Sequence, residues 1–283
     1  MTTPNWASLR EEFPTLARWN YLDIARKTIP PRCQERALQE YVRDVYENAG
    51  AGAWSADNVA EARAVMARLL GAKPSEIAFT KNTTEGLNIA AHGFDLKPGD
   101  NVVLTDLEHM ANIWVWKHWE AKGVEIRFAA NRGGRLPLDA FLEKMDGRTR
   151  AVSTAYVTYG NGCRVNLPEL GSVCRDRGVR LVVDGVQAAG ILAAPLNELG
   201  ADIVAIGGHK GLLGLTGSGV VYCRDNEDVE DAVRIMEGKQ IRRLPVLNEA
   251  MQMVGMVSLG DVSHALPRDI TGEVAKAVSA HHP

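Results

Sequence analysis

Residues 203–211 read Ile-Val-Ala-Ile-Gly-Gly-His-Lys-Gly, and this stretch decides the fold. Its four apolar residues predict a buried strand, and the glycines let the chain turn at the strand end. Residues 181–187, Leu-Val-Val-Asp-Gly-Val-Gln, repeat the pattern with an acid at the strand end. Further short apolar runs occupy residues 77–80, 102–105, 125–129, 151–157 and 220–223.

Helix-like segments separate several of these runs. Apolar residues recur at helical spacing in residues 31–48, 59–70, 111–121 and 167–177. Alternating strands and helices predict an α/β fold, in which a mostly parallel sheet has helices on both faces.

Composition excludes several classes of protein. The 283 residues are 46% hydrophobic and 24% charged, which is typical of a soluble globular protein. The net charge is −3 and no polybasic run occurs, so we expect neither nucleic acid nor membrane as a partner. Four scattered cysteines form no CxxC pair, which predicts no metal site and favours a reducing cytoplasm as the compartment.

Two charged residues follow buried strands, where ligands bind in parallel sheets. Lys210 comes four residues after the last apolar residue of such a strand. Burial and neighbouring positive charge would favour its neutral, nucleophilic form, although a lone lysine here is more often a solvated loop residue. Asp184 ends a strand, where an acid is costly unless a cation pairs with it. A protonated pyridine nitrogen would serve, and a capping aspartate is the alternative.

Two further strand ends carry polar residues. Thr83 and Thr84 stand at the start of a predicted helix, where hydroxyls, free N–H groups and the helix dipole suit a phosphate. A plain N-cap explains the same residues. His109 follows the run at 102–105 and would stack on a planar ring, or else be solvated.

The order and spacing of these residues resemble the class V aminotransferase family. This family includes cysteine desulfurases, selenocysteine lyases and isopenicillin N epimerase-like proteins. The resemblance covers roughly residues 8–223 and implies the large domain of a fold-type I transferase that depends on pyridoxal 5'-phosphate (PLP).

The resemblance also implies a role for each site residue. Lys210 resembles the catalytic Schiff-base lysine, and Asp184 resembles the partner of the pyridine nitrogen. Gln187 resembles the donor to the phenolic oxygen of the ring. His109 resembles the stacking histidine, with a second, catalytic role in proton transfer. The residues that resemble phosphate contacts are Thr83, Thr84 and His209.

The chain departs from the desulfurase pattern in three places. Gly207 stands where desulfurases usually have serine, and residues 158–159 read Thr-Tyr instead of Ser-Asn. Residues 23–26 read Asp-Ile-Ala-Arg instead of Asp-Asn-Ala-Ala. Tyr159, together with Gly162 and Arg164, looks more like the epimerase and lyase side of the family. We therefore expect a small amino acid as substrate and leave the reaction open among desulfurase, lyase and epimerase types.

The character of the sequence changes near residue 225, which predicts a domain of residues 1–223 and a second part of residues 224–283. The second part resembles a single CBS motif, a small α/β module, in residues 230–237, 240–246 and 254–261. Ser258 and Asp261 match positions that contact adenosine nucleotides in that family, and a helix N-cap is the alternative.

The resemblance implies more protein than this sequence contains. Family members continue into a small domain that supplies the arginine for the substrate carboxylate, so we expect impaired turnover. The alternative function is an inactive fusion that binds PLP or an adenosine nucleotide and carries a regulatory CBS module. Because fold-type I sites usually form between two copies and CBS motifs work in pairs, we expect a homodimer.

Overall fold

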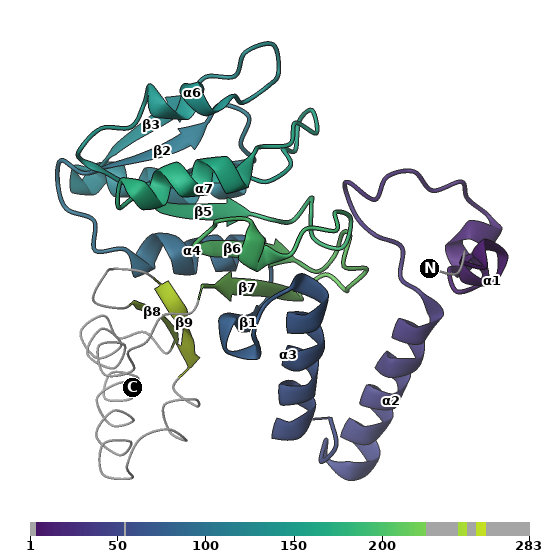
Figure 1. Ribbon diagram of the computed structural model, residues 1–283. Coiled ribbons are helices and arrows are strands. Elements are labelled where there is room, and N and C mark those ends of the chain that lie inside the picture. The colour runs from purple at the N-terminus through teal and green to yellow at the C-terminus, as the bar shows by residue number, and fades with distance from the viewer. Residues whose placement is uncertain (1–3, 54, 225–242, 248–252, 259–283) are drawn as a thin grey trace, which may run out of the picture.

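The computed structural model describes residues 4–53, 55–224, 243–247 and 253–258. Its centre is a sheet of seven strands: Ile77–Thr80 (β1), Asn101–Thr105 (β2), Glu125–Ala129 (β3), Thr149–Ala155 (β4), Arg180–Asp184 (β5), Ile203–Gly207 (β6) and Gly219–Cys223 (β7). Their order across the sheet is β1-β7-β6-β5-β4-β2-β3 (Figure 1). Strands β3, β2, β4, β5 and β6 are parallel neighbours, and β7 is antiparallel to β6 and β1. The predicted mostly parallel sheet is confirmed.

Helices cover both faces of the sheet because alternate strand residues point to opposite sides. On one face, Val102 and Leu104 share a core with Thr83–Gly93 (α4), Met110–Lys117 (α5) and the 3₁₀ helix His118–Lys122 (η3). On the other face, Val103 packs in a core with Ala56–Leu70 (α3), Leu138–Leu142 (α6) and Leu167–Asp176 (α7).

The remaining helical elements are two short turns beside the sheet and an N-terminal arm. Short 3₁₀ turns at Pro74–Glu76 (η2) and Leu196–Glu198 (η4) precede β1 and β6. Helix Trp6–Glu11 (α1), the 3₁₀ turn Pro14–Ala17 (η1) and helix Arg32–Asn48 (α2) form an N-terminal arm that stands away from the sheet (Figure 1). Helix α2 has no buried residue in the described structure.

The bounds predicted from the sequence for these strands and helices are close to the observed ones. Each predicted strand of the sheet begins and ends within two residues of its observed bounds. The helix expected at residues 111–121 is instead α5 followed by η3, and the tighter turn ends at Gly123, whose φ is +79°. The helix expected at residues 59–70 begins at Ala56, because the Ser55 side chain caps it by accepting from the Asn58 N–H.

Two strands lie beyond the predicted boundary at residue 223. Arg243–Leu247 (β8) and Met253–Ser258 (β9) form an antiparallel pair, and they overlap the stretches 240–246 and 254–261 that resemble a CBS motif. Ser258 is the last residue of β9, and Asp261 lies outside the described residues. The division into residues 1–223 and 224–283 therefore stays a prediction, as does nucleotide binding by Ser258 and Asp261.

Candidate functional site

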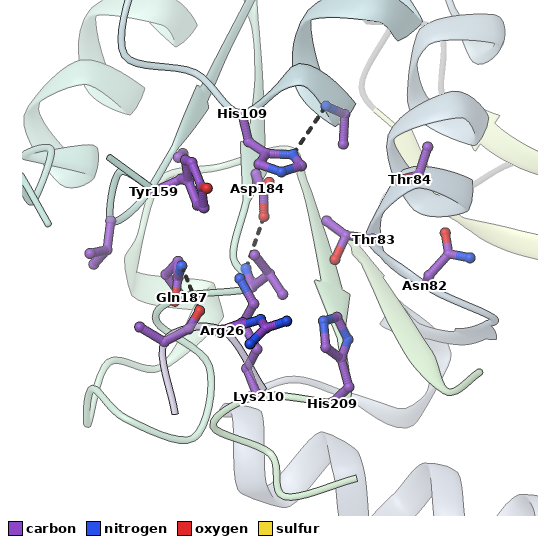
Figure 2. Close-up of a pocket in the computed structure, with 15 residues that line it drawn as sticks. Arg26, Asn82, Thr83, Thr84, His109, Tyr159, Asp184, Gln187, His209 and Lys210 are labelled. Carbon is purple, nitrogen blue, oxygen red and sulfur yellow. Dashed lines mark hydrogen bonds between the residues drawn. The ribbon is translucent and has the colours of Figure 1, made fainter. Parts of the chain in front are cut away.

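A cavity of about 280 Å³ lies at the carboxyl ends of the parallel strands (Figure 2). It contains all seven residues predicted to hold the cofactor: Thr83, Thr84, His109, Asp184, Gln187, His209 and Lys210. The other lining residues are Ala25, Arg26, Asn82, Ala111, Ala155, Val157, Tyr159 and Val186. Six separate segments of the chain thus meet at one edge of the sheet.

The floor of the cavity carries a buried acid. Asp184 ends β5 and is only 3% exposed. Burial raises the pKa of this carboxyl, while a hydrogen bond from the Val186 N–H (3.0 Å) and the charges of Lys210 and His109 lower it. A cation that enters the cavity would therefore stabilise the ionised form of Asp184.

Lys210 reaches the cavity from the loop after β6 and is half-buried. Burial lowers the pKa of its ammonium group, and the Asp184 carboxylate partly offsets this effect. Backbone hydrogen bonds fix the loop, since Gly208 N–H donates to Ser218 (2.8 Å) and Gly214 N–H donates to Gly208 (2.7 Å). The lowered pKa makes the nucleophilic amine more available at neutral pH.

One end of the cavity is the N-terminus of α4. Asn82 caps this helix by accepting from the Glu85 N–H at 2.9 Å. Thr83 follows, and its buried Oγ1 has no hydrogen-bond partner in the described structure. Gly207 lies opposite, where an added Cβ would come within 2.8 Å of Thr83 Oγ1 and 3.0 Å of His209 Nδ1. A polar ligand at this end would satisfy a hydroxyl that is otherwise costly to bury.

The wall of the cavity is formed by His109, the N-cap of α5. Its Nδ1 accepts a hydrogen bond from the Ala111 N–H at 3.1 Å, so a neutral ring carries its proton on Nε2. Tyr159 packs edge-on against the ring, with 5.0 Å between the ring centroids. His109 therefore has a fixed place in the wall of the cavity.

A second buried acid lies behind this wall. Glu108 accepts from Thr105 Oγ1 (3.0 Å) and the Ala155 N–H (2.8 Å) on one oxygen, and from Asn112 Nδ2 (2.8 Å) on the other. The pKa of Glu108 is raised to about 7. Burial is the main cause and the nearby charge of Asp184 adds to it, while these hydrogen bonds partly offset the rise. Glu108 links the start of α5 to Ala155, which pairs with Asp184 in the sheet. Sequence reasoning did not identify this residue.

Gln187 and His209 connect the site to the N-terminal part of the chain. Gln187 Nε2 donates to the Ala25 carbonyl (3.0 Å), and the His209 carbonyl accepts from the Thr28 N–H (2.8 Å). Burial lowers the pKa of the His209 ring, with smaller contributions from the charges of Lys210 and Lys27. These contacts bring residues 25–28 to the cavity, which the sequence did not predict.

The thiols contribute nothing to this cavity. Cys33 is exposed, Cys163 is half-buried, and Cys174 and Cys223 are buried; none of them lines the cavity. Burial raises the pKa of Cys174 to about 12 and also that of Cys223, so both buried thiols stay protonated at neutral pH. Among the described residues, no cluster of His, Cys, Asp or Glu could hold a metal ion. No described helix is long and apolar enough to cross a membrane.

Comparison with known proteins now identifies the family. The model of the family "Aminotransferase class-V" matches residues 20–253. The chain belongs to the class V aminotransferase family. The matched range includes the whole cavity and runs past residue 223 into the segment expected to be CBS-like. No comparison supports the CBS-like interpretation or an adenosine nucleotide as ligand.

Individual proteins that are similar to this chain are named as cysteine desulfurases. A "Probable cysteine desulfurase" of Methanothermobacter thermautotrophicus is 34% identical over 76% of this chain and 55% of the relative. A "Cysteine desulfurase" of Cronobacter sakazakii is 33% identical over 81% of this chain and 60% of the relative. The apo structure of a cysteine desulfurase from Thermococcus onnurineus is similar, with a TM-score of 0.73, 27% identity, and coverage of 98% of this chain and 70% of that one. The chain thus spans little more than half the length of these curated relatives.

Proposed function

We propose that this class V chain binds PLP at the cavity and acts on a small amino acid, as a cysteine desulfurase-like enzyme. The observation that carries the proposal is the meeting of Lys210, the buried Asp184 and the start of α4 in one cavity. Bound PLP would supply an electron sink for bonds at the α carbon of an amino acid. Each part of the cavity offers the group that one part of PLP requires.

The phosphate is proposed to lie at the N-terminus of α4. Thr83 Oγ1 is buried without a partner, and Thr84 is the next residue of the same helix. The first N–H groups and the dipole of α4 favour an anion there. His209 lines the same cavity, and Gly207 leaves open the space that a side chain would crowd.

The ring is proposed to lie between the buried acid and the wall of the cavity. Asp184 would pair with the protonated pyridine nitrogen, which compensates the cost of burying its charge. His109 would stack on the ring, since its own ring is fixed by Ala111 and Tyr159. Gln187 uses one amide hydrogen on the Ala25 carbonyl, so its second remains for the phenolic oxygen.

Lys210 is proposed as the residue that links to the cofactor and then moves the α proton of the substrate. Its lowered pKa favours the free amine that both tasks need. His109 is proposed to assist in proton transfer through Nε2, because Nδ1 is engaged with the Ala111 N–H. No described cysteine lines the cavity, so we assign no sulfur-carrying role to this part of the chain.

Titration of the purified protein with PLP would test this function. We expect an absorbance band of bound cofactor in the wild type, a shift of that band on adding cysteine, and release of sulfide or another product. Lys210→Ala should abolish the wild-type band but retain reversible PLP binding through the phosphate end. A folded wild-type protein that never retains PLP would contradict the proposal.

We further propose that two copies of the chain associate. Helix α2 buries none of its residues, yet its Leu38, Tyr41 and Val42 are apolar and 41–51% exposed. A continuous apolar stripe of this kind is typical of an interface. Sedimentation equilibrium should report a dimer that Tyr41→Glu weakens. A wild-type monomer at micromolar concentration would contradict this.

The cytoplasm remains the proposed compartment. All four cysteines are unpaired, including the exposed Cys33. Free thiols at the surface suit a reducing environment. Labelling of Cys33 by a thiol reagent on protein taken directly from cells would support this, and a fully oxidised Cys33 would oppose it.

A further inference from the structure

One cationic side chain of the cavity, that of Arg26, has no role in holding the proposed cofactor. Arg26 lies on residues 21–28, which we call the strap, and it lines the cavity together with Ala25. Figure 2 shows it on the side of the cavity that carries Lys210 and His209, away from His109. This is one of the positions where the chain departs from the desulfurase pattern, in which an alanine stands here.

Hydrogen bonds hold the strap in place. The Tyr21 hydroxyl donates to the Lys27 carbonyl at 2.6 Å, which folds the strap back on itself. The Ala25 carbonyl accepts from Gln187 and the Thr28 N–H donates to the His209 carbonyl, so both flanks of Arg26 are tied to cavity residues. The backbone of Arg26 is therefore fixed relative to the site, although its side chain reaches into open space.

Among the residues that the structure describes, the guanidinium of Arg26 has one carboxylate nearby and is otherwise exposed. Its side chain is 85% exposed, and the carboxylate that the structure places near it is that of Asp23, at 4.0 Å and itself 57% exposed. An exposed pair at this separation contributes little to stability. The planar fork of N–H donors is thus available to a ligand, and a carboxylate matches its geometry.

The other charges of the cavity are already accounted for by the proposed function, on which this inference rests. The start of α4 at Thr83 suits the phosphate, and Asp184 suits the ring nitrogen. The anionic group of the substrate is the one charged group that still has no assigned partner in the cavity. We propose that Arg26 binds the α-carboxylate of the amino acid, as a substrate contact particular to this chain.

Paired ligands would test this contact. PLP-loaded protein would be titrated with L-alanine and with L-alaninamide, which lacks the carboxylate, and the change in cofactor absorbance would report binding. Arg26→Ala should weaken the binding of alanine about tenfold, as expected for one charge-assisted contact. Alaninamide should bind Arg26→Ala and wild type within about twofold of each other, by the same reasoning. Arg26→Lys should lie between wild type and Arg26→Ala for alanine, because it keeps the charge without the fork.

Lys27→Ala is the matched control, because it removes the same charge from the next residue of the strap, which does not line the cavity. Its ratio of alanine to alaninamide affinity should equal that of wild type. Equal losses for both ligands in Arg26→Ala, or a loss of PLP affinity alone, would overturn the carboxylate contact while the proposed cofactor site stands. A wild-type protein that takes up no PLP would overturn both proposals.

Discussion

Glu108→Gln should change how the stability of the cofactor-free protein depends on pH. The Glu108 carboxyl is buried, and burial raises its pKa from 4.5 to about 7. Between these pH values the unfolded chain loses the Glu108 proton while the folded protein keeps it. The free energy of unfolding therefore falls as pH rises through this window, and this contribution has its full size above pH 7.

The magnitude follows from the two pKa values. Each tenfold change in proton affinity corresponds to about 1.4 kcal/mol, so a rise from 4.5 to about 7 costs about 3 kcal/mol of stability above pH 7. Glutamine has no proton to lose in this range. The difference in unfolding free energy between wild type and Glu108→Gln should thus move by about 3 kcal/mol in favour of the variant between pH 4.5 and pH 7.5.

At low pH the variant should be the less stable protein. The Trp116 indole N–H can only donate, and it donates to Asn112 Oδ1 at 3.3 Å. The NH2 group of Asn112 must therefore face residue 108, to which it donates. The Ala155 N–H faces the other oxygen of Glu108. An amide has one oxygen for these two donors, so one of them loses its acceptor at a cost of about 1–3 kcal/mol.

Urea unfolding of the two cofactor-free proteins at intervals from pH 4.5 to pH 7.5 would measure both effects. The control is Glu198→Gln, which changes an exposed glutamate and should leave the curve parallel to that of wild type. Parallel curves for wild type and Glu108→Gln would refute the reasoning, because they would mean that Glu108 binds protons equally in the folded and unfolded states.

Three further predictions concern the cavity and the helix that shapes it. Asp184→Ala should weaken PLP binding by about 3–5 kcal/mol, since the ring nitrogen would lose its buried partner; retention equal to wild type on dialysis would oppose this. Thr83→Val should raise the unfolding free energy of the cofactor-free protein by about 1 kcal/mol or more while weakening PLP, because it removes a buried hydroxyl without a partner; losses in both measurements would contradict the account. Gly86→Ala should lower the melting free energy by about 1–3 kcal/mol, because its Cβ would lie 2.5 Å from Val221 on the sheet, whereas Gly147→Ala, with nothing within 4 Å, should have little effect.

The sheet, and the meeting of Lys210, Asp184 and His109 at one edge of it, were predictable for one physical reason. Strands buried on both faces are short, nearly continuous apolar runs, and the carboxyl ends of parallel strands meet at one edge. Lys210 and Asp184 each follow such a run, so their meeting could be inferred without knowing the strand order. The antiparallel direction of β7 could not be inferred, because an apolar run has the same pattern in either direction.

Contacts between segments that are distant in the sequence and lack helical or strand periodicity could not be predicted from the sequence. Residues 21–28 have no helical or strand period, yet Ala25 contacts Gln187, which is 162 residues away. The role of Glu108 left a weak signal, since Asn112 follows it by four residues at the start of a helix, where such pairs face the same side. The exposure of α2 was also not predictable, because its apolar spacing is typical of a helix that packs against a core.

The central claim is that Lys210 holds PLP in this cavity, and one measurement tests it most directly. The protein would be loaded with PLP, reduced with borohydride, digested and analysed by peptide mass mapping. We expect the cofactor mass on the peptide that contains Lys210, with Lys27 and the other lysines unmodified. A modified peptide without Lys210, or no modified peptide from a folded protein, would contradict the account.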